Sequence, residues 1–564
     1  GDRSHEGEVD NLATFYRQRS TKGSQDHRPL GDISGSEAVY VKTPLWNYAD
    51  PQYAEFKTAQ KDRRAVIYVG ANDGMLHAFH ADTDAQAQPP IAGGDEAWAY
   101  VPSLVFPTLY QLADKDYPGK HRFFVDGTPV IGDICASNCQ NSSAVWKTIL
   151  VGGLGRGGQG YYALDVTDPA TPKALWEFGN DYLGYTYGNP VITKLKNGTW
   201  VVIITSGYNN TDGVGRLFIL NANTGELLRT IATTAGDKDT PSGLAKITAW
   251  ANFPDVNNTA ERVYGGDLLG NLWRFDINGD ILPDGYDAHL LATLKDANGK
   301  AQAITARPEL GKVKNHPVVF VGTGKLLGAS DFEPSPTGPK FQRQSFYAIK
   351  DRLDATEYGN PRSTEVTKDG TAIKAFTAWT IGTGECPQGA SFCKAAQGNN
   401  KADPTATEEN PPRKEGETDE QYAARLAQTR QQAISNAMGP YNDGWYVDLP
   451  GDGEQSNTDP SLQRGSIVFT TNRPLEGGGC EPKASSFRYF IDYRTGSAIE
   501  GTNGIIGVKI ADSLATRAAV VVLTTDKLFG LTRIDKPAIE PAEIPTPPAG
   551  EAARRVSWRE LVVE

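Results

Sequence analysis

One hairpin pattern occurs seven times along the 564 residues. Each copy has a β-branched run, a turn rich in Gly, Asn or Asp, and a second run that often ends on an aromatic residue and an Asp. Apolar alternation on both sides of such a turn predicts two antiparallel strands. The copies occupy residues 65–82, 148–168, 201–225, 261–276, 317–328 with 344–351, 466–474 with 486–496, and 518–535.

The spacing of the copies predicts the architecture. Most copies begin about 55 residues after the previous one, a period that suits a four-stranded blade of a β-propeller. The 60 Gly and 35 Pro residues agree with many turns and short strands. We therefore predict an all-β fold, a modified seven-bladed β-propeller with loop and helical insertions. A solenoid built from the same repeats is the alternative, because the spacing does not demand ring closure.

Two spacings are much longer than the rest and define the domain organisation. We expect an N-terminal linker or extension at 1–30 and a propeller at 31–564, with insertions at about 84–147 and 352–444. Insertions of this kind often carry binding functions, because surface loops tolerate growth.

The second insertion contains a predicted helix. Residues 397–417 are polar and are expected to form a surface excursion. Thr418 and Gln421 then form a capping box, and Gly439 with Pro440 ends the helix. We expect this helix to pack on the propeller, with partner binding as the alternative. Its apolar stripe is Tyr422, Ala423, Leu426, Ala433, Ile434 and Ala437. The tail at 537–550 is expected to be linker-like.

Charge and hydropathy exclude several functions. The 56 Lys and Arg against 68 Asp and Glu give a net charge of -12, which argues against binding nucleic acid through its phosphates. The longest apolar run, 518–523, is too short to span a bilayer. The chain begins at Gly1 without an initiator Met, so we expect part of a longer, secreted precursor with its targeting segment upstream.

The five cysteines are too few for a fold held together by disulfides. Cys135 and Cys139 form one close pair, and Cys386 and Cys393 form another, so we expect local disulfides with free thiols as the alternative. Neither pair has the further Cys or His that a zinc site requires. Cys480 is left over.

No catalytic motif is apparent. The seven His are scattered, and the sequence has no HExxH, GxSxG or Walker-type phosphate loop. The Gly-rich run at 152–160 precedes a strand pattern, so it is expected to be a hairpin turn and not a helix start that faces a phosphate.

A metal site is the stronger signal. In the run 276–287, Asp276, Asn278, Asp280 and Asp284 fall at loop positions 1, 3, 5 and 9, and the Leu282 carbonyl falls at position 7. Calcium prefers such oxygen donors at alternate positions. The loop departs from an EF-hand, which has Gly at position 6 and Glu at position 12. An Asp- and Asn-rich turn without a metal is the alternative.

A second candidate lies just upstream, in residues 255–263. Asp255, Asn257, the Thr259 carbonyl and Glu261 are its candidate ligands. Its spacing is weaker, because six residues separate the first carboxylate from the last and no third acid lies between them.

Six separated motifs give the sequence a family resemblance. They are residues 31–41, 66–81, 203–225, 259–276, 444–450 and SWREL at 557–561. In this order they resemble the C-terminal β-propeller domain of the PilY1/PilC family of type IV pilus biogenesis factors and adhesins. The resemblance covers nearly the whole chain. It implies a secreted, pilus-associated protein with a separate N-terminal adhesive region, and calcium-regulated pilus extension and retraction, surface attachment and twitching motility.

The resemblance also implies a position for the calcium loop, directly before a motif like Arg-Val-Tyr-Ala-Gly-Asp. Carried over residue by residue, Glu261 falls at the last ligand position and Thr259 at the carbonyl position. Asn257 and Asp255 fall at the third and second, while Phe253, which cannot be a ligand through its side chain, falls at the first. Both acidic loops therefore stand as candidates for Ca²⁺.

The resemblance further implies the partners and the location. We expect pilins and minor pilins as partners, a host cell or abiotic surface reached through the full-length protein, and a cell-surface or extracellular location, with the outer membrane as an alternative. Two other classes of protein are alternatives. Quinone-dependent dehydrogenases have similar repeats but need an acidic base at a cofactor site, and none is apparent. An outer-membrane assembly scaffold would lack the calcium loop and the insertions.

Overall fold

The computed structural model divides the chain into two compact units. Unit 1 comprises residues 1–245, 253–260 and 559–564, and unit 2 comprises 246–252 and 261–558. The predicted extension at 1–30 lies outside the described residues except for Leu30. The structure describes residues 30–88, 90–114, 117–281, 283, 285–328, 331, 341–381, 392–396, 414, 416–475, 483–500, 502, 505–522, 527–534 and 539–546.

All seven predicted hairpins are present as antiparallel pairs. In chain order the pairs are β2 with β3, β6 with β7, β10 with β11, β14 with β15, β18 with β19, β26 with β27, and β29 with β30. The Gly-rich run at 152–160 joins β6 to β7, as predicted for a hairpin turn.

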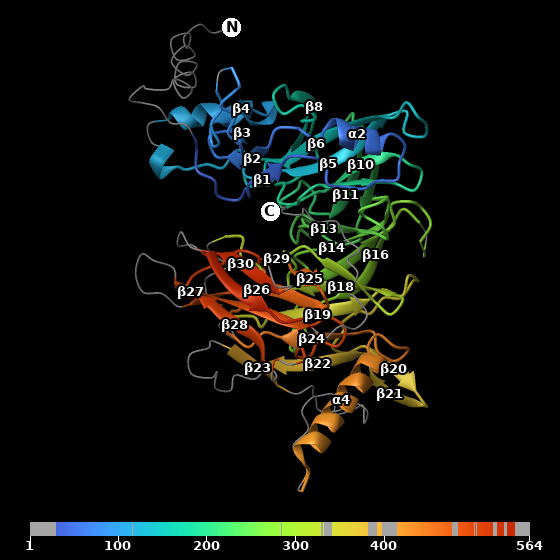
Figure 1. Ribbon diagram of the computed structural model, residues 1–564. Helices are drawn as coiled ribbons and strands as arrows, with labels where there is room; N and C mark the ends of the chain where they lie inside the picture. The colour runs from blue at the N-terminus through green and yellow to red at the C-terminus, as the bar shows by residue number, and fades with distance from the viewer. Residues whose placement is uncertain are drawn as a thin grey trace. The chain divides into compact units, whose positions relative to one another are not determined.

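Unit 1 contains three four-stranded sheets, each an antiparallel meander in chain order (Figure 1). The first is β1 (Val39–Val41), β2 (Val66–Ala71), β3 (Met75–His80) and β4 (Glu96–Tyr100). The second is β5 (Val130–Ser137), β6 (Val145–Gly153), β7 (Tyr161–Asp165) and β8 (Lys173–Phe178). The third is β9 (Val191–Lys194), β10 (Trp200–Thr205), β11 (Arg216–Asn221) and β12 (Leu227–Ala232).

Unit 2 begins with a fourth meander of the same kind: β13 (Ile247–Ala251), β14 (Ala260–Gly266), β15 (Asn271–Phe275) and β16 (Ala288–Thr293). A ten-stranded sheet follows, in the order β17 (Glu309–Val313), β18 (His316–Gly322), β19 (Ser345–Lys350), β24 (Gly444–Asp448), β22 (Phe376–Ile381), β23 (Phe392–Ala396), β28 (Ile505–Ala511), β27 (Lys483–Asp492), β26 (Ser466–Leu475) and β25 (Ser461–Gln463). The last described sheet is β29 (Ala519–Val522), β30 (Leu528–Arg533) and β31 (Ile539–Ile544).

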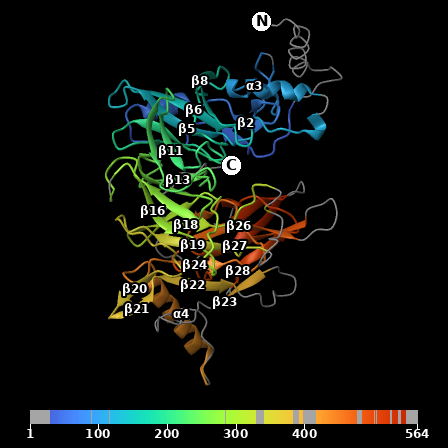
Figure 2. The same cartoon turned by 180° about the vertical axis from the view of Figure 1, so that it is seen from behind.

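The ten-stranded sheet contains two of the repeated sheets, joined through the second insertion. The insertion supplies β22, which runs parallel to β24, and β23, which pairs with β28. Figure 2 shows β26, β27 and β28 side by side in this region.

Burial falls from the second strand of the third sheet to its last strand. In the third sheet, every residue of β10 is buried, whereas five of the six residues of β12 are exposed. A strand covered on both faces reads as a continuous apolar run, which explains the Val-Val-Ile-Ile sequence of β10. The third sheet therefore buries its second strand most deeply and exposes its last one.

The first long spacing contains both strands and short helices. It holds β4, the helical turns η1 (Ser103–Val105), α3 (Phe106–Leu109), η2 (Tyr110–Ala113) and η3 (Tyr117–Gly119), and β5. Thus part of this predicted insertion completes the first sheet and begins the second. A further helix, α2 (Tyr53–Ala59), lies between β1 and β2.

The second insertion contains the predicted helix and a small hairpin. The helix α4 (Asp419–Asn436) begins with the predicted capping box, in which Thr418 and Gln421 bond each other's backbone N–H groups. The hairpin is β20 (Glu365–Lys368) with β21 (Thr371–Lys374). Residues 397–413 of the polar excursion lie outside the described residues.

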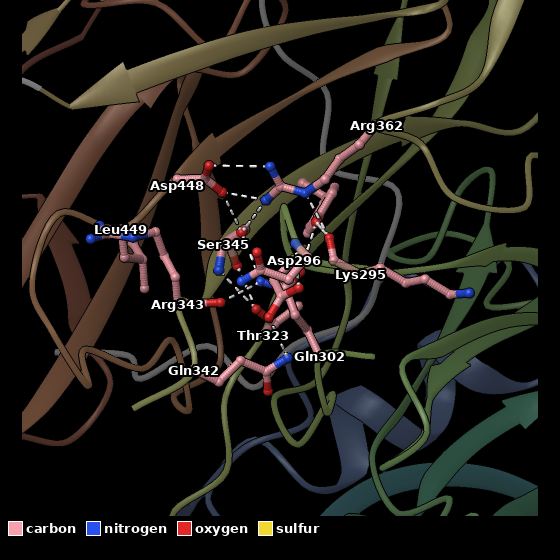
Figure 3. A network of polar contacts seen from close by, with 12 residues as sticks. Lys295, Asp296, Gln302, Thr323, Gln342, Arg343, Ser345, Arg362, Asp448 and Leu449 are labelled. Carbon is pink, nitrogen blue, oxygen red and sulfur yellow. Dashed lines mark hydrogen bonds and ion pairs between the residues drawn. The ribbon is translucent and has the colours of Figure 1, made fainter. Parts of the chain in front are cut away.

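Within unit 2, a polar network ties the start of this insertion to β19, β24 and the loop after β16 (Figure 3). Arg362 forms a two-pronged ion pair with Asp448 of β24 and also donates to Ser345 Oγ and the Lys295 carbonyl. Gln302 Nε2 donates to Ser345 Oγ at 2.9 Å. Because each donor finds an acceptor, the network holds the insertion without leaving a buried charge unpaired.

One sequence expectation is wrong, and one is confirmed in part. The tail at 537–550 is not wholly linker-like, because β31 pairs along β30 from Leu528↔Ile544 to Arg533↔Ile539. Pro541 is compatible with this strand because β31 is the outermost described strand of its sheet, where a missing N–H is tolerated. Cys135 and Cys139 form the predicted disulfide.

Three further expectations fall where the structure gives no description. Cys386 and Cys480 lie outside the described residues, as does the SWREL motif at 557–561. Among the described residues, no helix is long and apolar enough to cross a membrane.

Candidate functional site

The downstream acidic loop connects β15 to β16 in unit 2. Phe275 ends β15 and Ala288 begins β16, so the loop joins neighbouring strands of the fourth sheet. The Asp276 N–H donates to the Asp287 carbonyl at 3.0 Å and closes the base of the loop. Asp276, the first candidate ligand predicted from the sequence, therefore lies at the base of the loop, directly after the aromatic residue that ends β15.

The Asp276 carboxylate organises the loop around itself. Its Oδ1 accepts the N–H groups of Asn278 and Gly279 at 2.9 and 2.8 Å, and its Oδ2 accepts the Ile281 N–H at 2.8 Å. Asp276 is 1% exposed. Carboxylate side chains commonly form such turns by accepting nearby backbone N–H groups. The three amides stabilise the negative charge of this buried carboxylate.

Glycine is needed at the bend. Gly279 has φ +79°, and a Cβ there would lie 2.2 Å from Cε2 of Tyr286. Gly285 also has positive φ, at +74°. The loop therefore folds back closely on itself at two positions that suit glycine best.

The loop reaches the strand that carries the other candidate. Asn278 Nδ2 donates to the Glu261 carbonyl at 3.0 Å, and the Glu261 carboxylate accepts Asn252 Nδ2 at 3.3 Å. The register Val263↔Phe275 explains the contact, since it runs β14 alongside β15 toward both residues. The structure thus brings Glu261, predicted for the upstream loop, next to Asn278 of the downstream loop.

Asp287 is a residue that the sequence prediction missed. Burial raises the pKa of the Asp287 carboxyl, and the nearby Asp276 charge raises it further. Counted from Asp276, Asp287 is at position 12, where calcium-binding loops of the EF-hand type carry a carboxylate. That spacing was the signal that could have found it.

The upstream loop has a different local structure. The Phe253 carbonyl accepts the N–H groups of Val256, Asn257 and Asn258, which makes a tight turn. Asp255 and Asn257 are exposed, and Asn257 Oδ1 accepts the Thr259 hydroxyl at 2.6 Å. Phe253, at the first position of the pattern implied by the resemblance, is 53% exposed.

The division between the units falls inside the upstream set. Asp255, Asn257 and Thr259 belong to unit 1, and Glu261 belongs to unit 2. Within unit 1, the Asp255 carbonyl accepts the Asn47 N–H at 2.9 Å, and Thr259 forms an isolated bridge with Lys194. The side-chain oxygens of Asp255 and Asn257 remain at the surface of unit 1.

The donor chemistry of the downstream loop fits a hard cation. Asp276, Asn278, the exposed Asp280 and Asp287 offer carboxylate and amide oxygens, the ligands that Ca²⁺ prefers. Two candidate ligands, Leu282 and Asp284, lie outside the described residues. Within the described part of the chain, no three His, Cys, Asp or Glu side chains form a metal-binding group.

A buried ion-pair cluster lies on the strands that lead into the loop. Arg274 Nη1 of β15 pairs with Asp351 Oδ1 at 2.6 Å, and both side chains are 1% exposed. The Tyr264 hydroxyl donates to Asp351 Oδ2 at 2.6 Å, and Arg262 Nε donates to the Tyr264 oxygen at 2.6 Å. Arg262 also lies over the Trp250 ring, 4.5 Å from its centroid. The cluster fixes the strands on which the loop is mounted.

Comparison with known proteins first gives the class of protein. A solved structure, the crystal structure of the Pseudomonas aeruginosa PilY1 C-terminal domain, matches with a TM-score of 0.62 and 24% sequence identity, and covers 90% of this chain and 99% of that chain. Together with the repeated antiparallel sheets, this match confirms the predicted β-propeller fold.

The family follows from the sequence. The family model described as the PilY1 beta-propeller domain matches residues 30–370. The chain belongs to the PilY1 family, and the resemblance seen in the six motifs is confirmed.

Relatives agree with this assignment. The type IV pilus biogenesis factor PilY1 of Pseudomonas aeruginosa strain PAK is 36% identical over 382 residues, which is 61% of this chain and 30% of that protein. A PilY1 homolog of Xylella fastidiosa strain Temecula1 is 30% identical over 543 residues, which is 89% of this chain and 31% of that protein. The chain therefore matches about a third of the length of these relatives.

Proposed function

We propose that this chain is the calcium-binding propeller domain of a type IV pilus biogenesis factor. The observation that carries the calcium proposal is the geometry of the downstream loop. The buried Asp276 carboxylate accepts the Asn278 N–H, and the Asn278 side chain bonds the Glu261 carbonyl where β15 ends and β14 begins. Membership of the PilY1 family and the names of the relatives support the pilus assignment. No catalytic step is part of the proposal, because these relatives are named as biogenesis factors.

The residues of the downstream loop would hold the ion with oxygen donors. The described candidates are Asp276, Asn278 and Asp280, which the sequence predicts, and Asp287, which the structure adds. Leu282 and Asp284 are the other two ligands predicted from the sequence. A bound divalent cation would supply positive charge against the mutual repulsion of these carboxylates. Asp276 would keep the turn folded in either state, because its oxygens hold the loop amides.

Calcium is proposed to act as a switch by shifting the populations of two conformations of the downstream loop. A cation that binds one loop conformation better favours that conformation by the difference in binding free energy. In the full-length protein, this shift would regulate pilus extension and retraction, twitching motility and surface attachment. The proposed partners are pilins and minor pilins, and the proposed location is the cell surface with the pilus, with the outer membrane as an alternative.

The binding test is calorimetric titration of the purified chain with CaCl₂, with MgCl₂ as a parallel titrant. Asp280→Lys puts an ammonium into the downstream loop and is expected to weaken calcium binding at least ~10-fold, or about 1.4 kcal/mol. Asp255→Lys makes the same charge change in the upstream loop. Asp239→Lys is the matched control, since Asp239 is exposed in a turn of unit 1 outside both loops.

The outcomes separate the two loops. Loss in Asp280→Lys alone assigns calcium to the downstream loop, and loss in Asp255→Lys alone assigns it to the upstream loop. If wild type shows no binding at millimolar calcium, the calcium proposal fails for both loops.

The regulatory part needs a separate test in cells that carry the full-length protein. Asp280→Lys on the chromosome is expected to remove the dependence of twitching zones and surface pilus number on external calcium, whereas Asp239→Lys retains it. An Asp280→Lys strain that still responds to calcium, although its purified chain no longer binds the ion, would disprove the regulation but not the binding.

A further inference from the structure

Unit 1 contains a pocket of about 590 Å³ built between the first insertion and the Gly-rich hairpin turn. One wall comes from the helical turns η1, α3 and η2, through Leu104, Thr108 and Gln111. These three residues are spaced three and four positions apart, so they share one helical face. The other lining residues include the 156–159 turn and residues 121–124. A volume of this size is typical of ligand pockets.

Apart from the phenol of Tyr185, the ionisable side chains that line the pocket are basic. They are His121, Arg122 and Arg156. In a chain with a net charge of -12, such a lining is a local reversal of the overall charge. A pocket of this kind selects anionic ligands, because a cleft lined by one sign of charge focuses its field.

The carboxylates of exposed Asp32 and buried Asp126 neutralise part of this charge. His121 Nε2 lies 2.9 Å from Asp32 Oδ1, and Arg156 Nε lies 3.7 Å from Asp126 Oδ2. Arg122 is exposed and has no carboxylate at ion-pair distance among the described residues. Arg122 is therefore the uncompensated cation of the pocket.

The Arg156 side chain is oriented by an aromatic ring. Its guanidinium lies over the Phe123 ring, 4.9 Å from the centroid, while the side chain stays 41% exposed. Stacking through the flat face leaves the edge of a guanidinium available for a carboxylate. The ring also provides an apolar surface next to the charge.

The Gln111 side chain favours a ligand that carries a hydrogen-bond donor. Gln111 Oε1 is buried and has no hydrogen-bond donor among the residues that the structure describes. An unmet buried acceptor costs free energy that a ligand N–H can recover once the Gln111 side chain turns toward the pocket. A simple inorganic anion offers no N–H for this acceptor, whereas a peptide backbone offers both an N–H and a neighbouring carboxylate.

The turn that forms one wall is held in place. The Gly158 carbonyl accepts the Thr186 N–H at 3.3 Å, and a Cβ on Gly157 would lie 1.8 Å from the Phe124 oxygen. The turn thus packs directly on the backbone beneath it. A wall fixed before binding lowers the ordering cost of binding.

We propose that this pocket binds an acidic peptide segment, with an Asp or Glu carboxylate on Arg122 and Arg156 and an apolar neighbouring side chain on Phe123. The Gln111 carbonyl oxygen accepts a backbone N–H of the same segment. The proposal is independent of calcium, because all of these residues belong to unit 1 and none is a candidate ligand.

The test uses fluorescence polarisation with a pool of end-blocked, labelled pentapeptides that carry Asp or Glu at the centre and Leu or Phe beside it. A twin pool carries Asn or Gln at the centre. Wild type is expected to bind the acidic pool and to bind the amide pool at least ~10-fold more weakly, as for loss of a charged hydrogen bond.

Variants place the interaction in the pocket. Arg122→Gln is expected to weaken the acidic pool ~5-fold to ~10-fold, since the side chain is exposed and partly screened. Arg229→Gln is the matched control, because Arg229 is exposed on β12 and does not line the pocket. Both changes remove an exposed cation, so a fold defect is not expected from either.

Several results overturn the proposal. These are no binding of the acidic pool at ~1 mM protein, equal binding of the two pools, or equal losses in Arg122→Gln and Arg229→Gln. Inorganic phosphate that competes as strongly as the peptides would show a general anion pocket instead. Sodium glucuronate that binds where the peptides do not would show a site for acidic sugars.

Discussion

Carboxylates in two regions of this chain have different partners. Asp351 is buried with Arg274, so a protein cation balances its charge. Asp276 is equally buried, but its carboxylate accepts hydrogen bonds from three backbone amides of its own loop. The comparison shows two ways to bury a carboxylate. In one region a protein cation balances its charge, and in the other only neutral amides bind it among the described residues, so an added cation can still balance the charge.

The largest expected effect comes from breaking the buried ion pair between Asp351 and Arg274. Asp351→Asn leaves the Arg274 guanidinium buried without its counter-charge and should lower the free energy of unfolding by about 3–5 kcal/mol. Guanidinium unfolding followed by Trp fluorescence measures this, with exposed Asp369→Asn as control. A loss below about 1 kcal/mol would show that Asp351 and Asp276 are not different in kind.

A second buried charge cluster, around His77, predicts that the stability of unit 1 depends on pH. His77 is buried between Asp73 and Glu96, at 3.0 and 2.5 Å. Burial alone would lower the pKa of His77, but the hydrogen bonds and charges of Asp73 and Glu96 raise it to about 9.

The sign follows from the raised pKa. Stabilisation by protonated His77 is fully present below the unfolded value of about 6.5 and is lost as pH rises through about 9. The loss amounts to about 3 kcal/mol. His77→Gln should flatten the stability profile between these two values in urea unfolding at a series of pH values. An unchanged slope would contradict the pairing.

Gly279→Ala probes the geometry of the acidic loop. It should cost about 1 kcal/mol more than Gly299→Ala, because both glycines have φ near +80° but only the new Cβ at 279 meets the Tyr286 ring. The same change in a Tyr286→Ala background should match Gly299→Ala. Denaturant unfolding measures all of these differences, and equal costs at the two glycines would show that the ring does not constrain the bend.

The smallest effect is expected at the edge of the acidic loop. Burial and the Asp276 charge disfavour ionised Asp287, so Asp287→Asn should stabilise the calcium-free chain at pH 7 by a few tenths of a kcal/mol. In excess calcium the same variant should be less stable than wild type. Thermal unfolding with and without calcium tests this reversal, and the same sign in both conditions would exclude Asp287 as a ligand.

Much of the fold could be predicted because each hairpin is a local pattern. Alternation and turn residues placed all seven pairs, and Thr418 with Gln421 marked the start of α4. The tail at 537–550 was misjudged because its Pro and Glu residues resemble a linker, and only pairing with β30 makes it a strand. The spacing of Asp276, Asn278 and Asp280 marked the loop, but the contact with Glu261 depends on strand register.

The sequence by itself determined the repeat, the all-β class, the family resemblance and the acidic loop, since all of these depend on residues close together in the chain. Only the tertiary structure decided which charges meet. Asp351 reaches Arg274 across 77 residues, and the pocket joins the 152–160 turn to the first insertion. Such contacts depend on how sheets and loops pack, and packing leaves little trace in any one segment of sequence.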